Sequence, residues 1–233
     1  MLIKGLQKLT LLDFPEKMAC TVFTFGCNLR CPFCHNASLV LSERADDTLI
    51  PEEEFFSFLQ KRRGILEGVC VTGGEPTLQP DLPAFIRRIR ELGFAVKLDT
   101  NGARPAVLKT LVAEGLLDYV AMDVKNSLSL YPETVGHPTF DTAAVEESMD
   151  FLMEGHIPFE FRTTLVKGLH TPASVEEMGR RLAGQEKFFL QTFEDSGDLI
   201  AGDENTLASF APAETAELLG ILRQYVPNAQ IRG

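Results

Sequence analysis

The sequence ACTVFTFGCNLRCPFCHN, residues Ala19–Asn36, joins a strand pattern to three closely spaced cysteines. Its first seven residues are mostly apolar or β-branched, and such a run predicts a β-strand. Cys27, Cys31 and Cys34 follow with the spacing C-x3-C-x2-C, and His35 comes directly after them. Since clustered thiols in a reducing compartment more often bind metal than form disulfides, this stretch predicts a metal centre at the end of a strand.

The three cysteines allow four interpretations, of which we favour an iron–sulfur cluster. Three thiolates can hold three irons of a [4Fe–4S] cluster and leave the fourth iron open to a small molecule. A Cys3His zinc site is the second interpretation, but the adjacent Cys34 and His35 would rarely both reach one tetrahedral ion. A disulfide with a spare thiol is disfavoured by the compartment, and ordinary buried cysteines are disfavoured by the polar neighbours. Cys20 and Cys70 lie inside strand patterns, so we interpret both as small buried hydrophobic residues.

The composition places the chain among globular proteins of the cytosol. Its 233 residues carry a formal net charge of -11 with a pI of about 4.9, and 45% of them are hydrophobic. That apolar fraction can form a sizeable core, while the acidic balance argues against a nucleic acid partner. The N-terminus lacks a signal-peptide pattern, and no apolar run reaches the ~20 residues that a membrane span needs. We therefore expect a cytoplasmic protein that binds neither nucleic acid nor membrane.

Short apolar runs alternate with longer amphipathic patterns along the chain. Strands are predicted at 19–25, 68–72, 95–100, 119–125, 159–166 and 188–193. Helices are predicted at 51–63, 82–92, 105–114, 142–155, 172–184 and 213–226, with Thr171 as the N-cap of the fifth. Repeated strand-then-helix units indicate a parallel α/β sheet, and no Gly-x-Gly-x-x-Gly follows the first strand. We therefore predict a partial (β/α)6 TIM-like barrel, whose chemistry would lie at the carboxyl ends of its strands.

Polar residues follow the predicted strands at those ends. TGGEP (Thr72–Pro76) follows the second strand, and its glycines would let a ligand approach the backbone beside the Glu75 carboxylate. The other tip residues are Asp99, Thr100, Asn101, Asp123, Lys125, Arg162, Thr164 and Gln191. The two aspartates, with Thr100 and the Met122 carbonyl, could hold a hard cation or an ammonium group. Lys125 and Arg162 could hold a carboxylate, and a structural salt bridge is the alternative for all these charges.

The quoted motifs resemble the radical S-adenosylmethionine (radical SAM) superfamily over nearly the whole chain. CNLRCPFC after a strand, followed by TGGEP, carries this resemblance. Within the superfamily the chain is most similar to activases of glycyl-radical enzymes, whose pattern includes Asp13 and Pro15 before the first strand, then DTNG and DVK. The most similar activases are the anaerobic ribonucleoside-triphosphate reductase activating proteins, followed by those of pyruvate formate-lyase. The resemblance implies a single radical SAM domain over 1–233, with an N-terminal extension (1–17), the partial barrel (18–195), and a C-terminal loop and helix (196–233).

The resemblance also implies how the cofactors bind. Cys27, Cys31 and Cys34 would hold a [4Fe–4S] cluster whose open iron binds the amino and carboxylate groups of S-adenosylmethionine. The other implied contacts are Gly73, Gly74 and Glu75 with the amino group, Lys125 and Arg162 with the carboxylate, and Phe33 with the adenine. Asp99 would assist at the amino group or share a monovalent cation site with Thr100, Met122 and Asp123. Some activases carry a histidine near the ribose on the sixth strand, where this chain has Gln191 and Phe193.

The activity implied by the resemblance begins with reductive cleavage of S-adenosylmethionine. The resulting 5′-deoxyadenosyl radical would take a hydrogen atom from a glycine of a partner enzyme. No insertion of extra cysteines follows Cys34, so the ferredoxin-like domain of some other activases is missing and a flavodoxin or ferredoxin would supply the electron. Two other hypotheses are a radical enzyme that acts on a small molecule and a non-catalytic zinc or electron-transfer protein. A glycyl radical on a partner, and iron with sulfide rather than zinc, would separate these hypotheses.

Overall fold

A computed structural model describes residues 1–41, 49–195, 199–201 and 207–232 of the chain. The strands in these ranges form one sheet, in the order in which they occur along the chain. The first pair of strands is antiparallel, and every later pair is parallel. The strands are β1 (Ile3–Thr10), β2 (Ala19–Thr24), β3 (Gly68–Gly73), β4 (Ala95–Thr100), β5 (Tyr119–Asp123), β6 (Phe159–Leu165), β7 (Phe188–Thr192) and β8 (Gln230–Arg232).

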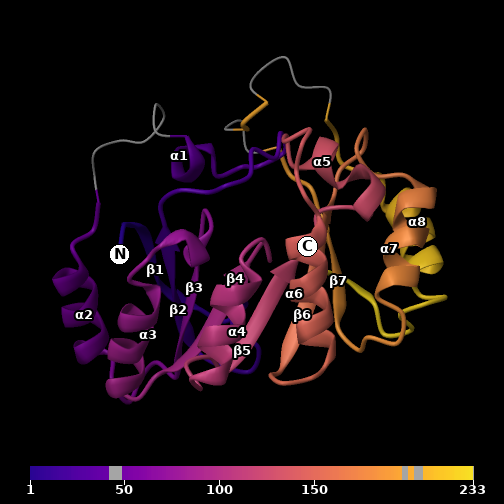
Figure 1. Ribbon diagram of the computed structural model, residues 1–233. Helices are drawn as coiled ribbons and strands as arrows, with labels where there is room; N and C mark the ends of the chain where they lie inside the picture. Colours follow the sequence, from indigo (N-terminus) through magenta and orange to yellow (C-terminus); the bar gives the residue numbers. More distant parts are fainter. Residues whose placement is uncertain (42–48, 196–198, 202–206, 233) are drawn as a thin grey trace.

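Helices connect most of the parallel strands. They are α1 (Ala37–Val40), α2 (Glu52–Lys61), α3 (Leu82–Glu91), α4 (Pro105–Ala113), α5 (Tyr131–Thr134), α6 (Ala143–Met153), α7 (Pro172–Arg181) and α8 (Pro212–Leu222). Short 3-10 turns occur at η2 (Pro76–Leu78) and η3 (Leu128–Leu130). The longer helices surround the outer face of the curved sheet, whereas α1 and α5 lie above the carboxyl ends of the strands (Figure 1).

The predicted partial α/β barrel is confirmed, and the structure adds a strand at each edge of the sheet. The predicted strands correspond to β2 through β7, with ends that differ by up to two residues. β1 lies inside the predicted N-terminal extension, and β8 lies inside the predicted C-terminal loop and helix. The linear strand order leaves the sheet open between β1 and β8, as a partial barrel requires. The division of the single domain into those three parts stays a prediction.

The helices form where local signals and burial agree. On α3, the predicted apolar face of Leu82, Phe85, Ile86 and Ile89 is buried throughout. This spacing places the four side chains on one stripe of a helix with 3.6 residues per turn. Thr171 is the N-cap of α7, as predicted. Its hydroxyl oxygen accepts the N–H of Ser174 at 3.1 Å, while the Ser174 hydroxyl oxygen accepts the N–H of Thr171 at 3.0 Å. The main core lies between these helices and the outer face of the sheet.

A smaller apolar cluster closes the amino end of the barrel. Phe14, which is 2% exposed, packs with Ala19 and Tyr119, the first residues of β2 and β5. It also lies against Gly68, the first residue of β3, where an added Cβ atom would come within 2.8 Å of the Phe14 ring. The polar tip residues therefore lie at the other end of these strands.

The described residues form no helix that is both long and apolar enough to cross a membrane.

Candidate active site

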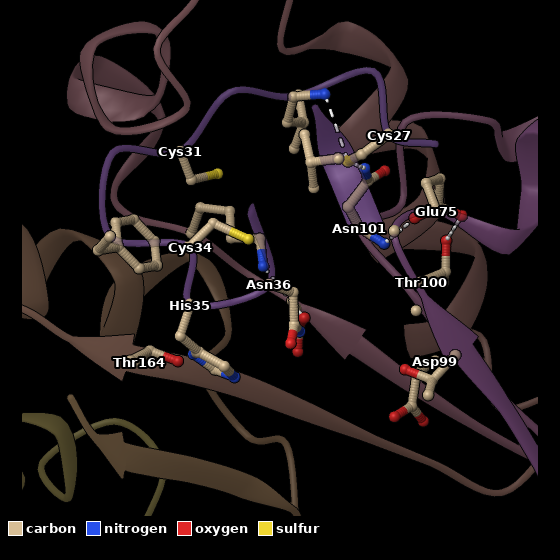
Figure 2. A pocket seen from close by; sticks show the side chains of 18 of the residues that line it. Cys27, Cys31, Cys34, His35, Asn36, Glu75, Asp99, Thr100, Asn101 and Thr164 are labelled. Atoms are coloured by element: carbon tan, nitrogen blue, oxygen red, sulfur yellow. Dashed lines mark hydrogen bonds and ion pairs between the residues drawn. The ribbon is translucent and has the colours of Figure 1, made fainter. Parts of the chain in front are cut away.

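The three clustered cysteines lie in the segment that leaves the carboxyl end of β2. All five cysteines of the chain have free thiols. Cys20 and Cys70 are fully buried in their strands, as predicted, whereas Cys27, Cys31 and Cys34 line one pocket. Figure 2 shows the three sulfur atoms around the same end of this pocket, with Asn101 and Glu75 beside Cys27. No disulfide uses the three pocket thiols, so they are available as ligands.

Two distant segments and an arginine fix the course of the cysteine loop. The Arg30 guanidinium donates to the backbone oxygens of Cys27 at 2.7 Å and Leu29 at 2.9 Å. The Arg30 N–H donates to the Val135 oxygen at 2.9 Å. From the C-terminal part of the chain, the N–H groups of Ile200 and Ala201 donate to the oxygens of Cys34 and Pro32 at 3.2 and 3.0 Å. The loop therefore keeps its shape without regular secondary structure of its own.

The chemistry of the thiols fits a cluster better than a single ion. Burial raises the pKa of Cys27 to about 11 and the pKa of Cys31 to about 12. Such thiols form thiolates readily only when a metal binds them. Within the described residues, no three side chains of His, Cys, Asp or Glu are gathered closely enough to hold one metal ion. Each cysteine of a [4Fe–4S] cluster binds a different iron, so such a cluster does not need its three ligands to meet at one point.

The two glycines of TGGEP allow close backbone packing, and the predicted approach of a ligand to them stays a prediction. Gly73 has a φ of +122°, and a Cβ atom there would lie 2.2 Å from the Thr24 nitrogen. A Cβ atom on Gly74 would lie 2.1 Å from the Gly26 oxygen. Only glycine permits this contact, which brings the end of β3 against the start of the cysteine loop. Both glycines also line the pocket.

Glu75 is fully buried, and its carboxylate connects the segment after β3 with the end of β4. It accepts the N–H and hydroxyl of Thr77 at 3.1 and 2.5 Å, the hydroxyl of Thr100 at 2.8 Å, and the N–H of Asn101 at 2.7 Å. Burial raises its pKa, although these donors oppose the shift. The carboxylate therefore fixes the ends of β3 and β4 relative to each other at the wall of the pocket.

Asp99, Asp123, Arg162 and Lys125 form a chain of ion pairs across the strand ends. Arg162 donates from Nη1 to Asp99 at 3.1 Å and from Nε to Asp123 at 2.9 Å, and Lys125 lies 3.1 Å from Asp123. The buried Lys97 pairs with Asp99 from below. Burial disfavours both charged aspartates, but these cations outweigh it and lower the pKa of each. The two carboxylates are therefore already paired with three protein cations.

Backbone contacts hold Lys125 in place. Its N–H donates to the Tyr131 hydroxyl at 3.3 Å, and its carbonyl oxygen lies 2.9 Å from Nε2 of His170. Because the Val166 N–H donates to Nδ1 of His170 at 3.0 Å, Nε2 carries the proton and donates to Lys125. Sequence reasoning assigned His170 no role, and no sequence signal connects it with Lys125.

The structure brings nearly all the predicted site residues to one pocket. Those that line it are Cys27, Cys31, Phe33, Cys34, Gly73, Gly74, Glu75, Asp99, Thr100, Asp123, Lys125, Arg162 and Gln191. Met122 does not line the pocket, and its side chain is buried in the core. The monovalent cation site stays a prediction, and the ion pairs of Asp99 and Asp123 favour the structural salt bridge that was its alternative.

The pocket also contains residues that were not predicted as site residues. His35 and Asn36 follow the last cysteine, Asn101 follows Asp99 and Thr100, and Thr164 lies two residues beyond Arg162. Three of them are direct neighbours of motif residues, and Thr164 shares the strand face of Arg162. The sequence had already placed Asn101 and Thr164 among the polar residues at strand tips, although it gave them no specific role, and the period of two along a strand supports Thr164.

Comparisons with known proteins agree with this geometry. The family model described as "Radical SAM superfamily" matches residues 21–182. A protein of Methanocaldococcus jannaschii named "Putative glycyl-radical enzyme activating enzyme MJ1227" is 31% identical over 236 residues, which cover 99% of this chain and 95% of the relative. A "Probable GTP 3',8-cyclase" of Thermococcus kodakarensis is 33% identical over 150 residues, which cover 63% of this chain but only 47% of the cyclase.

Solved structures match the fold. The structure of Streptococcus suis SuiB bound to precursor peptide SuiA aligns with a TM-score of 0.70 at 16% identity and covers 95% of this chain. The chain corresponds to 50% of SuiB. The structure of HemN, the coproporphyrinogen III oxidase of Escherichia coli, aligns with a TM-score of 0.58 at 15% identity, over 92% of this chain and 53% of HemN. At these identities the likeness extends to the fold alone.

Proposed function

The chain belongs to the radical SAM superfamily, and we propose that within it the chain is an activase that installs a glycyl radical on a partner enzyme. Enzymes of this superfamily use a [4Fe–4S] cluster and S-adenosylmethionine. The observation that carries the proposal is the convergence of three free thiols with Glu75 and the ion pairs on one pocket. The relative named as an activating enzyme supports it, because it aligns over almost the full length of both chains.

In this proposal the three cysteines hold the cluster and leave one iron open. When bound at these cysteines, the cluster would supply the electron for reductive cleavage of S-adenosylmethionine, and the product radical would take a hydrogen atom from the partner's glycine. The chain's own residues bind and orient the cofactors and exclude side reactions. The buried Glu75 fixes the loop ends beside Cys27, and its carboxylate also offers negative charge to an ammonium group.

The ion-pair chain would orient the other end of S-adenosylmethionine. Lys97, Lys125 and Arg162 contribute three positive charges, and Asp99 and Asp123 contribute two negative ones. The surplus of one positive charge suits the carboxylate of the methionine portion. Lys125 and Arg162 line the pocket and would meet that carboxylate, whereas Phe33 and Gln191 would lie near the adenosine.

The partner that we propose is an anaerobic ribonucleotide reductase, with a flavodoxin or ferredoxin as the electron donor. The resemblance of the N-terminal segment supports this choice, and so does Gln191 at the position where some activases carry histidine. A formate-lyase type of partner is the alternative within the same class. A small-molecule substrate is the second candidate function, because cyclases align with a large part of this chain.

The test uses the anaerobically reconstituted protein with dithionite, S-adenosylmethionine and each purified candidate partner. We expect 5′-deoxyadenosine to form and the partner to show the doublet of a glycyl radical in electron paramagnetic resonance. A partner whose radical glycine is replaced by alanine is the control and should show no doublet. If 5′-deoxyadenosine forms with GTP while neither partner gives a doublet, the activase proposal is wrong.

A further inference from the structure

Asn101, directly after β4, has its side-chain amide directed at one of the three clustered thiols. It is 5% exposed and lines the pocket. Its Nδ2 atom lies 3.9 Å from the Cys27 sulfur (Figure 2). The same atom lies 2.9 Å from Oδ1 of Asn28. The two N–H groups of one amide can therefore serve these two acceptors at the same time.

The surrounding hydrogen bonds leave this amide one orientation. Oδ1 of Asn101 accepts the N–H of Ala103 at 2.9 Å, so the oxygen must face the turn and the nitrogen must face the cysteine loop. The backbone N–H of Asn101 donates to the buried carboxylate of Glu75 at 2.7 Å. Asn101 is thus fixed through both its backbone and its side chain, and its N–H groups cannot turn away from Cys27.

The Cys27 sulfur differs from the other two in this respect. Besides the Asn101 amide, it accepts the backbone N–H of Leu29 at 3.4 Å. Among the described residues, no side chain from another strand donates to the sulfur of Cys31 or Cys34. The Leu29 donor belongs to the cysteine loop itself, whereas Asn101 reaches the sulfur from the next-but-one strand of the sheet. Because Asn101 is far from Cys27 along the chain, the overall fold and not the cysteine loop places this donor beside the sulfur.

We propose that Asn101 is a positioning residue that holds an N–H group against the Cys27 thiolate and thereby raises the reduction potential of the cluster. Hydrogen bonds to cluster sulfurs stabilise the reduced, more negative state, and outer residues of this kind tune metal centres. The inference rests on the cluster of the proposed function, but it does not depend on the partner or on the activase reaction.

The experiment compares Asn101→Ser, Asn101→Asp and Asn36→Ala with the wild type, each reconstituted with iron and sulfide in the absence of S-adenosylmethionine. Serine retains an oxygen that can accept the Ala103 N–H but has no donor long enough to reach the sulfur. Aspartate places a carboxylate oxygen where the N–H was. Asn36→Ala removes another amide from the pocket wall; within the part of the chain that the structure describes, this side chain neither caps α1 nor donates to a sulfur. The midpoint potential is measured by redox titration monitored by electron paramagnetic resonance, together with iron and sulfide content.

We expect Asn101→Ser to shift the reduction equilibrium toward the oxidised cluster by threefold to tenfold, the upper figure being about 59 mV for one electron. Asn101→Asp should lower the potential further, and Asn36→Ala should leave it unchanged. An unchanged potential in both Asn101 variants at full iron loading would overturn the inference, and so would an equal shift in Asn36→Ala. If Asn101→Ser fails to load iron, the midpoint potential of Asn101→Asp tests the inference instead. A wild-type protein that loads a cluster but gives no glycyl radical would refute the activase and leave this inference standing.

Discussion

The two ends of the same strands are built from opposite kinds of residues. At the carboxyl ends, β4, β5 and β6 carry Asp99, Asp123 and Arg162, which form ion pairs with one another and line the pocket. At the amino ends, Phe14 packs on Ala19 and on other first residues of the strands and seals the barrel. At the carboxyl ends, charged groups are partly buried, which costs free energy of folding. At the amino ends, apolar packing contributes favourably to the free energy of folding.

This difference separates function from stability along each strand. In α/β barrels the carboxyl-end face carries the chemistry, and the amino-end face contributes stability. The distinction is not complete, because buried Lys97 lies below Asp99 and connects the site to the interior. Substitutions at the carboxyl ends should therefore change cluster binding and activity, and substitutions at the amino ends should change the free energy of unfolding. A substitution of Asp99 should change both.

The largest expected effect is at the cysteines. Cys31→Ala should remove a cluster ligand and reduce 5′-deoxyadenosine formation to the background of the assay. Cys70→Ala, which removes a fully buried thiol from β3, should retain the cluster and lower the free energy of unfolding by about 1 kcal/mol. Iron content and 5′-deoxyadenosine yield are the measurements. A Cys31→Ala protein with full iron content and activity would show that the wrong cysteines have been assigned.

Asp99→Asn should affect stability strongly, although Asp99 lies at the functional end. The substitution leaves the ammonium of Lys97, which is 1% exposed, without its carboxylate, and Arg162 loses one of two partners. Removing one partner of a buried ion pair costs about 3–5 kcal/mol. Urea unfolding of the metal-free protein at neutral pH measures this loss. The double variant with Lys97→Met is the control and should recover part of the stability; a double variant as unstable as Asp99→Asn would contradict the explanation.

The ion pairs of Asp99 with Lys97 and Arg162 also predict that the free energy of unfolding depends on pH. Burial opposes the charge of Asp99, but Arg162 and Lys97 outweigh it, so its pKa in the folded protein is lowered. The unfolded carboxyl group has a pKa of about 3.9. The stability from this group is therefore present above about pH 4 and is lost as the pH falls through the folded pKa. The difference in the free energy of unfolding between wild type and Asp99→Asn should become smaller as the pH is lowered. A difference that stays constant with pH would argue against the ion pair.

We expect the smallest effect on the site from a substitution at the amino ends of the strands. Phe14→Ala removes a ring that is 2% exposed and should lower the free energy of unfolding by about 3 kcal/mol. The iron content and the spectrum of the reconstituted cluster should not change, since the substitution is made at the opposite end of the strands. Loss of the cluster in a protein that remains folded at the assay temperature would show that the two ends are coupled.

Most of the fold could be predicted from the sequence, except for the edges of the sheet. β3 and β5 have nearly continuous apolar runs, as expected for strands of a parallel sheet that are buried on both faces. β1 has the sequence IKGLQKLT, and three consecutive residues of it are exposed, so no regular alternation marks it. β8 has only three residues and forms by pairing with β7. Such edge strands depend on tertiary contacts more than on local pattern.

The site could be predicted as a set of residues but not as a set of contacts. The rule that chemistry lies at strand tips was enough to select Glu75, Asp99 and Arg162. It could not indicate that Glu75 faces four protein donors or that Lys97 lies beneath Asp99. Those contacts depend on the register between strands and on side-chain conformations, which one sequence does not encode in any local pattern.

The most direct test of the central claim is electron paramagnetic resonance of the anaerobically reconstituted, dithionite-reduced protein with and without S-adenosylmethionine. We predict a [4Fe–4S]⁺ signal that changes when S-adenosylmethionine is added, because three cysteines leave one iron open to it. A cluster signal that ignores the added molecule, or bound zinc with no iron signal, would contradict the assignment of Cys27, Cys31 and Cys34 as the ligands of an open cluster.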